Sequence, residues 1–347
     1  IYFFSGNGIA VGATGVINVG SLTLGTNMTA GQIIFNDWDK YNKQTITNKS
    51  RSIAGGGDIT INGKINSIGD VILGAKNVNV EVDEDINTGA SFEVPNSACT
   101  TADDYSSNFM NLTGVDKATS ATKTSTGDVV LFGASAVNFK GDTYTAGGDF
   151  KAVSDSVISF TGTSSSDKAT VITNGGDVSL SVQRDERANV KIDLKNANID
   201  ASDKVSNQNG NVDVVASTIA ETFSWAMEGN KAEINIDTSD IKGDNVNIAV
   251  MATISGEVAE YDENVQFTDK EIEKNWKDAL EKHDDGVLDL IHDTIGFDIQ
   301  NLRTLTSATV VEVNSAITVK DSKIDAIGGT KVGAESGKEV THGNLNM

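Results

Sequence analysis

Acidic side chains are the first residues of this sequence that could do chemistry. The run Asp83–Gly89 places oxygen donors on alternate residues, as a calcium-binding loop does. Its glycine stands at the seventh place instead of the sixth, and Val94 occupies the position where such a loop needs a bidentate glutamate. We therefore interpret the run as a solvated acidic corner, and we predict no bound metal and no cofactor.

Nucleophiles and paired carboxylates are the next candidates. Ser165 and Lys168 have an S-x-x-K spacing, but they stand in a serine-rich turn where composition alone produces it. The sequence contains no nucleophile-elbow motif and no phosphate-binding glycine loop. Several acidic residues are predicted to face outward, where their common role is to keep a β-protein soluble. These are Asp149, Asp177, Asp193, Asp213 and Asp237. The sequence thus favours a protein that is not an enzyme.

A candidate binding surface lies on a predicted helical insertion over residues 259–303. The run Thr268–Glu271 forms a capping box, and Ile272, Trp276 and Leu280 follow at helical spacing. Insertions that leave a regular scaffold are where specific binding is commonly built. The residues we assign to this binding surface are Glu271, Glu273, Trp276 and Asp278.

The composition excludes several classes of partner. The 347 residues contain 27 Lys and Arg against 49 Asp and Glu, which gives a net charge of −22. This charge argues against binding to nucleic acid or to an anionic membrane surface. The single cysteine, Cys99, excludes an intrachain disulfide framework. Because the chain starts at Ile1 without an initiator methionine or signal peptide, we expect it to be an internal piece of a longer protein.

A repeated apolar pattern predicts the elements that carry these residues. Two apolar residues separated by one are followed, after four residues, by a third. The pattern occurs at Val71-Leu73-Val78, Phe92-Val94-Cys99, Val130-Phe132-Val137, Phe150-Ala152-Val157, Val190 and Ile192 leading to Leu194 and Ile199, Val212-Val214-Ile219, Ile234-Ile236-Ile241 and Ile317-Val319-Ile324. Val171-Thr173-Val178 also fits if threonine is allowed at one inward place. Successive starts at 130, 150, 171, 192, 212 and 234 differ by about 21 residues.

Alternation with a period of 2 is typical of strands, and Gly, Asn and Asp mark the corners between them. A repeat this short cannot form a propeller blade. We therefore predict an all-β fold, a right-handed parallel β-helix with about twelve coils of about 21 residues and a small helical insertion. Residues 1–55 would form the first coils, and 56–258 the main β-helix with a loop insertion near 101–125. The coils would resume over 304–347, after the 259–303 insertion.

One N-terminal stretch is more specific. The run Asn7–Leu22, preceded by Ile1-Tyr2-Phe3, reads NGIAVGATGVINVGSL. It resembles the filamentous-haemagglutinin type of two-partner secretion exoprotein, whose secretion domain ends in a run like V-Y-x-x-N-P-N-G-I-x-F-G-x-x-A-x-I-N-V-G-G-L. Ser5-Gly6-Asn7-Gly8 stands where N-P-N-G is usual, while the core Ile17–Gly20 is intact. The close match covers about 22 residues, and the resemblance implies that residues 1–55 contain the end of a secretion-domain-like region.

The resemblance implies a secreted or cell-surface protein of a Gram-negative bacterium, exported unfolded through an outer-membrane transporter of the two-partner type. We therefore expect an extracellular filamentous adhesin or its stalk, which binds a receptor or glycan on a host or neighbouring cell. One alternative is a carbohydrate-active enzyme, a polysaccharide lyase or hydrolase on the same scaffold. Another is a structural filament protomer that self-associates end to end.

Overall fold

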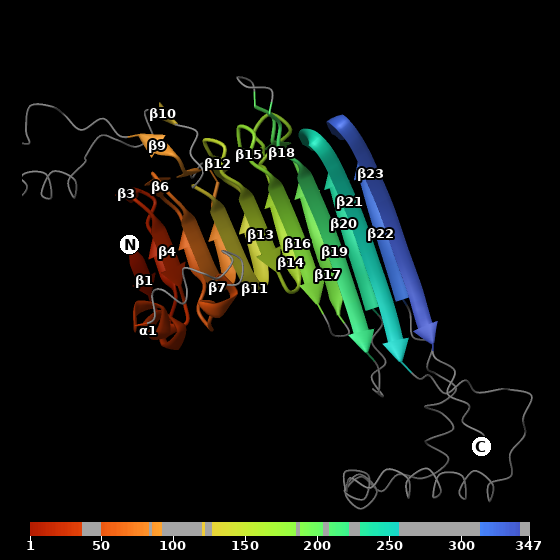
Figure 1. Cartoon of the computed structure of the whole chain (residues 1–347), viewed down its shortest axis with the longest axis horizontal. Coiled ribbons are helices and arrows are strands. Elements are labelled where there is room, and N and C mark those ends of the chain that lie inside the picture. The colour runs from red at the N-terminus through yellow and green to blue at the C-terminus, as the bar shows by residue number, and fades with distance from the viewer. Residues whose placement is uncertain are drawn as a thin grey trace, which may run out of the picture.

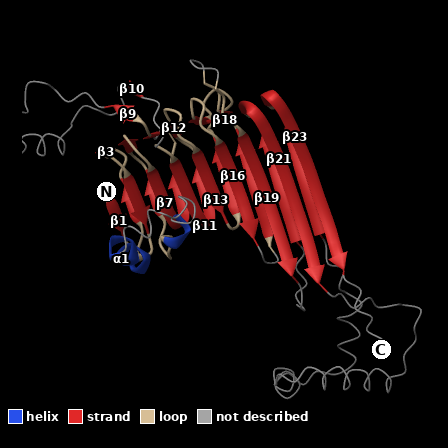
Figure 2. Cartoon of the chain, viewed as in Figure 1, coloured by secondary structure: helices blue, strands red, loops and turns tan. Residues whose placement is uncertain are grey.

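The computed structural model describes residues 1–36, 50–82, 85–91, 120–121, 127–184, 188–203, 208–221, 230–256 and 313–340. Parallel strands make up most of this part of the chain and follow one another around a rod (Figure 1; Figure 2). The predicted all-β solenoid, a parallel β-helix, is confirmed. Each strand pairs with its equivalents one coil before and one coil after.

Three faces make up each coil, and the chain passes through them in the order A, B, C. Face A contains β1 (Tyr2–Phe4), β4 (Leu22–Gly25), the first part of β7 (Val71–Val80), the first part of β11 (Val129–Phe139), β13 (Phe150–Ser154), β16 (Val178–Arg184), β19 (Val212–Glu221) and the ends of β21 (Asp240–Gly256) and β23 (Lys323–Val340). Face B contains β2 (Ile9–Val11), β5 (Ile59–Ile61), the second parts of β7 and β11, β14 (Val157–Thr161), β17 (Asn189–Lys195), β20 (Asn230–Asp237) and β22 (Val313–Lys320).

Face C contains β3 (Val16–Val19), β6 (Lys64–Ser67), β8 (Asp85–Asn87), β12 (Asp142–Tyr144), β15 (Ala169–Ile172), β18 (Ala197–Asp200) and the starts of β21 and β23. We number the coils 1 to 8 by these face C strands.

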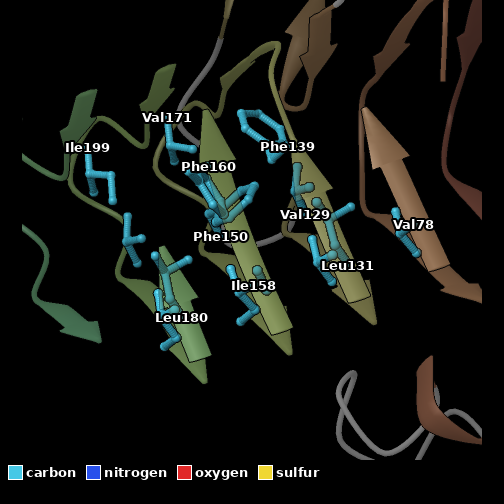
Figure 3. Packing of buried hydrophobic residues seen from close by; sticks show 14 of the residues in the cluster. Val78, Val129, Leu131, Phe139, Phe150, Ile158, Phe160, Val171, Leu180 and Ile199 are labelled. Carbon is cyan, nitrogen blue, oxygen red and sulfur yellow. The ribbon is translucent and has the colours of Figure 1, made fainter. Parts of the chain in front are cut away.

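The core is a set of apolar columns inside the coils. One column on face A contains Val71, Val129, Phe150, Val178, Val212 and Val246, all buried and joined by the strand register. Three aromatic rings fill the middle of the rod, where Phe139 stacks on Phe160 at 4.7 Å and Phe150 meets both edge-on (Figure 3). Each coil is thus stabilised by burial of its inward side chains against two neighbouring coils.

The coil length differs from the prediction. On the face A column 21 residues separate Val129 from Phe150, but 28 separate Phe150 from Val178 and 34 separate Val178 from Val212. The evenly spaced starts at 171, 192 and 212 lie on faces C, B and A respectively, so they are not equivalent positions. The described chain therefore forms fewer and longer coils than the twelve predicted, because extra residues at the corners leave the ladders undisturbed.

The prediction of which residues face inward was also wrong at two places. Val130 and Phe132 point outward, while Val129 and Leu131 enter the core. On β14 the inward residues are Ile158 and Phe160, and Val157 lies outside. Val130 and Phe132 are apolar because a segment of the chain covers the outer side of face A at that point. The triples that start at Val71, Val171 and Ile234 are buried as predicted, whereas Phe92, Val94 and Cys99 lie outside the described residues.

The covering segment includes α1 (Met28–Asn36), a helix that the sequence analysis did not predict. It lies between β4 and β5, beside the first strands of face A (Figure 2). The predicted helical insertion over 259–303 lies outside the described residues, as does most of the loop insertion near 101–125. From that loop Ser120–Ala121 (β10) pairs antiparallel with Ala90–Ser91 (β9). Residues 313–340 continue all three faces.

Two buried threonines on adjacent inward positions make a matched pair. The Thr143 hydroxyl is buried among aliphatic neighbours without a hydrogen-bond partner, whereas Thr145 donates toward the Gly148 and Thr173 carbonyls. We expect Thr143→Val to stabilise the protein by about 1 kcal/mol, because an unsatisfied buried hydroxyl is removed. Thr145→Val is expected to destabilise it by about 1–3 kcal/mol. Urea unfolding followed by circular dichroism measures both, and equal signs for the two variants would contradict this assignment.

Candidate functional site

The predicted binding residues Glu271, Glu273, Trp276 and Asp278 lie outside the described residues. What the structure describes is the pair of anchors on either side of them. The chain leaves face A at Gly256, the last residue of β21, and re-enters face B at Val313, the first residue of β22. The segment 257–312 therefore departs from the corner between faces A and B.

The same corner carries shorter excursions in the two preceding coils. Residues 222–229 connect β19 to β20, and residues 185–187 lie between β16 and β17. Their anchor points are stacked, since Glu221 pairs with Ser255 on face A and Asn230 pairs with Val313 on face B. In coil 5 only Asp155 and Ser156 cross this corner. The crossings thus lengthen from coil 5 to coil 8 along one edge of the rod.

A second feature is a column of aspartates at the corner between faces C and A. A Gly-Asp or Gly-Asn pair precedes the face A strand in several successive coils, at Asp70, Asp128, Asp149, Asp177 and Asn211. Each aspartate oxygen accepts the backbone amide of the equivalent residue one coil later, at distances from 2.8 to 3.0 Å. The column continues through Asn211, whose side-chain oxygen accepts from Asn245 at 2.9 Å. These carboxylates stabilise coil stacking.

Asp128 is electrostatically the most crowded member of this column. Burial raises the pKa of its carboxyl group, and the negative charges of Asp149 and Asp70 raise it further. The amide of Asp149 and the ammonium of Lys151 oppose that rise, and Lys151 also bonds Asp149 at 2.9 Å. The positive charge of Lys151 therefore acts on more than one carboxylate of the column.

The raised pKa of Asp128 predicts a pH dependence of stability. A carboxyl that holds its proton more tightly when folded adds stability as the pH falls through its folded pKa toward its ordinary value of 3.8, and loses that contribution as the pH rises. Asp128→Asn retains an oxygen for the Asp149 amide but carries no charge. At neutral pH we expect the variant to be more stable by a few tenths of a kcal/mol after solvent screening, and to lack this acid-side gain. Urea midpoints measured across the acid range, with Asp213→Asn as control, test this; parallel wild-type and Asp128→Asn curves would contradict it.

A third feature is a small cluster of ionisable groups on the outer side of face C. Asp85 and Asp142 occupy the same register position in coils 3 and 4, so their side chains extend from neighbouring strands. The Lys64 ammonium lies 3.9 Å from the Asp85 carboxylate, and the Tyr144 hydroxyl donates to Asp142 at 3.4 Å. Asp85 is only 9% exposed, whereas Tyr144 is 37% exposed. The cluster is therefore half open to solvent.

The two carboxyl groups of this cluster differ in environment. Burial raises the pKa of Asp142, and the charge of Asp85 raises it further. Burial and then the charges of Asp142 and Asp85 raise the pKa of Tyr144 to about 12, so this phenol stays protonated. Two neighbouring carboxyl groups in unlike surroundings are the kind of pair with which many enzymes cleave glycosidic bonds. The cluster has the group types for that reaction.

The structure corrects the interpretation of Asp83–Gly89 as a solvated corner. Asp85, Asn87 and Thr88 are buried or nearly so, and Asp85 is paired with Lys64. Asp83 and Glu84 lie outside the described residues. Within the described ranges, no three His, Cys, Asp or Glu side chains come together in a way that would hold a metal ion.

The outward acidic residues do not converge on one site. Asp149 and Asp177 belong to the corner column, and Asp213 lies on face A beside Asn247. Asp193 and Asp237 lie on face B, where Asp193 bonds Lys191 at 2.9 Å. The sequence analysis missed the Asp85–Asp142 pair because the two residues are 57 positions apart. The shared register of β8 and β12 brings them together.

Comparisons with known proteins add no relative: no protein-family model, curated protein or solved structure matches the chain. In the part of the chain that the structure describes, no helix has both the length and the apolar character needed to cross a bilayer.

Proposed function

We propose that this chain is part of an extracellular filamentous adhesin, or of the stalk of one, at the surface of a Gram-negative bacterium. In this proposal it reaches the outside through an outer-membrane transporter of the two-partner type and attaches to a receptor or glycan on a host or neighbouring cell. Its β-helix serves as a rod, and attachment uses the excursions from the rod.

The observation that supports this proposal most is the run of excursions along a single edge. Coils 6, 7 and 8 cross the A–B corner through progressively longer segments, and the last holds Glu271, Glu273, Trp276 and Asp278. Faces repeat similar side chains from coil to coil, whereas excursions vary freely and allow specific recognition. The resemblance of Asn7–Leu22 to secretion domains gives independent support. That run contributes β2, β3 and the start of β4, so it builds the first turns of the rod.

Replacing residues 257–312 with eight Gly and Ser residues tests the proposal. Such a linker is long enough, because residues 222–229 cross the same corner between equivalent anchors one coil earlier. We expect the shortened protein to keep its β-helix by circular dichroism and to lose binding to cells and to a glycan array. A control replaces residues 222–229 with eight Gly and Ser residues and should retain binding. Equal binding by the wild type and the 257–312 replacement would refute the choice of site.

Single substitutions refine the same test. Trp276→Ala is expected to weaken binding about 30-fold, since buried tryptophans dominate many interfaces. Trp225→Ala, which changes the same residue type in the shorter excursion, is the control and should leave binding within about twofold.

A carbohydrate-active enzyme is the second candidate, and the Asp85–Asp142 cluster is the observation that favours it. The test is to incubate the protein with neutral and acidic polysaccharides and measure new reducing ends. Release that disappears in both Asp85→Asn and Asp142→Asn would support the enzyme, and would displace the adhesin as the primary function. Release that persists in both variants would point to a contaminant.

A further inference from the structure

The outer side of face A is covered over the first coils by a strap, which we define as residues 26–36 and 50–58. The strap leaves coil 2 after β4, contains α1, and returns at β5. Asn27 ties its two halves together at the base. Its side-chain oxygen accepts the amides of Thr29 and Ala30 at 3.1 and 3.2 Å, and its side-chain nitrogen donates to the Ser52 carbonyl at 3.2 Å. Asn27 is thus the N-cap of α1 and also links the two halves of the strap by a hydrogen bond.

The strap forms an apolar cluster of its own, separate from the core inside the coils. Ala30 and Ile53 of the strap pack with Ile72 of coil 3 and Val130 of coil 4, and Phe4 of coil 1 packs against them. Ile53 and Val130 are fully buried. Strands that alternate apolar inward and polar outward elsewhere are apolar on both sides here, because both sides are covered.

Glycines on face A give the strap its close approach. Gly25 and Gly74 are register partners in coils 2 and 3. A Cβ on Gly25 would lie 2.9 Å from the Ile53 Cβ, and a Cβ on Gly74 would lie 2.4 Å from the Ser50 carbonyl oxygen. Any side chain at these two positions would push the strap away from the sheet. The sheet therefore carries a recess shaped for residues 50–53.

Arg51 extends the contacts of the strap further along the rod. Its guanidinium carbon lies 4.9 Å from the centre of the Phe132 ring in coil 4, and its Nη1 donates to the Asp155 carboxylate at 3.1 Å in coil 5. Together with Phe4, Gly25 and the residues of coils 3 and 4, these contacts connect one segment to five successive coils.

This arrangement departs from the energetics of an ordinary solenoid, in which each coil contacts only its neighbours and unfolding spreads in from the ends. We infer that the strap joins coils 1 to 5 into one cooperative unfolding unit, whereas coils 6 to 8 keep nearest-neighbour behaviour. The strap acts as an external brace that resists loss of the first coils.

Native-state hydrogen exchange in low urea tests the inference. For the wild type we expect the amides of β4, β7, β11 and β13 to share one protection factor, the ratio of intrinsic to measured exchange rate, because a common opening exposes them all. Amides of β16, β19 and β21 should instead show protection factors graded by position. Graded rates within coils 1 to 5 would overturn the inference.

Two substitutions sharpen the test. Arg51→Ala should accelerate exchange about fivefold throughout coils 1 to 5, because a cation–ring contact and a half-exposed ion pair are lost. Ile53→Ala should accelerate exchange in these coils by a factor on the order of 100. Ile53→Val should accelerate it by less, and this variant gives a measurement if the alanine variant does not fold. Acceleration by Arg51→Ala that stays within coils 4 and 5 would overturn the inference.

Arg184→Ala is the matched control for Arg51→Ala. The Arg184 guanidinium donates to the Ser156 hydroxyl at 3.3 Å and so connects coil 6 to its neighbour, coil 5. Its removal should accelerate exchange in coil 6, near β16 and β17, and leave the amides of coils 1 to 5 unchanged. If Arg184→Ala and Arg51→Ala spread equally far, the long reach would belong to the solenoid and not to the strap.

Discussion

Gly176→Ala is expected to destabilise the protein by about 3 kcal/mol or more, although it adds a single methyl group. Gly176 lies at the C–A corner between Gly148 of the preceding coil and Gly210 of the next, and a Cβ there would lie 2.1 Å from the Gly148 carbonyl oxygen. The obstacle is backbone on a stacked coil, so it cannot move without opening the spacing between coils. Urea unfolding followed by circular dichroism measures the loss.

The control for this prediction is Gly20→Ala. Gly20 stands at the equivalent kind of corner in the first coils, but a Cβ there meets no atom within 4 Å. Alanine at this position should be neutral, or stabilising by about 0.5 kcal/mol, because it restricts the unfolded chain. Similar losses for both variants would mean that corner glycines are needed for backbone freedom and not for close stacking.

Phe160→Ala is the second substitution with a large expected effect, a loss of about 3–5 kcal/mol. Phe160 is fully buried, stacks on Phe139 at 4.7 Å and meets Phe150 edge-on at 5.9 Å. The three rings come from coils 4 and 5, so the cavity would form where two coils are held together. The free energy of unfolding in urea gives the loss directly.

Phe3→Ala serves as the comparison, because Phe3 lies on β1 and is 53% exposed. Its removal is expected to cost less than about 1 kcal/mol. Phe160→Leu should fall between the two, since leucine leaves a smaller cavity. A loss of less than about 1 kcal/mol for Phe160→Ala would mean that the aromatic cluster does not hold coils 4 and 5 together.

The sequence predicted the class of the fold because alternation is a local property. Apolar residues at every second place predict a strand, and Gly-Asp pairs predict a corner. Neither prediction depends on what the strands pack against. The spacing of corners would have been the better guide to coil length. Gly148-Asp149, Gly176-Asp177 and Gly210-Asn211 are separated by 28 and 34 residues, which are the true coil lengths there.

The candidate sites were less accessible to prediction. Asp85 and Asp142 meet because β8 and β12 are neighbours across a long excursion, and no local pattern reports that pairing. The strap was missed for a related reason. Because the strap covers the outer side of face A, Val130 and Phe132 are apolar there. In the sequence these two residues therefore look like inward-facing core residues.

By itself, the sequence determined that the chain forms strands with small apolar inward residues, turned at glycine and aspartate corners and surrounded by an acidic surface. The tertiary structure alone decided the face of each strand, the length of each coil and the parts of the outer surface that are covered. The physical reason is that side-chain alternation and turn chemistry act between adjacent residues. Register instead depends on stacking between segments tens of residues apart, and corners accept insertions of any length without changing that stacking.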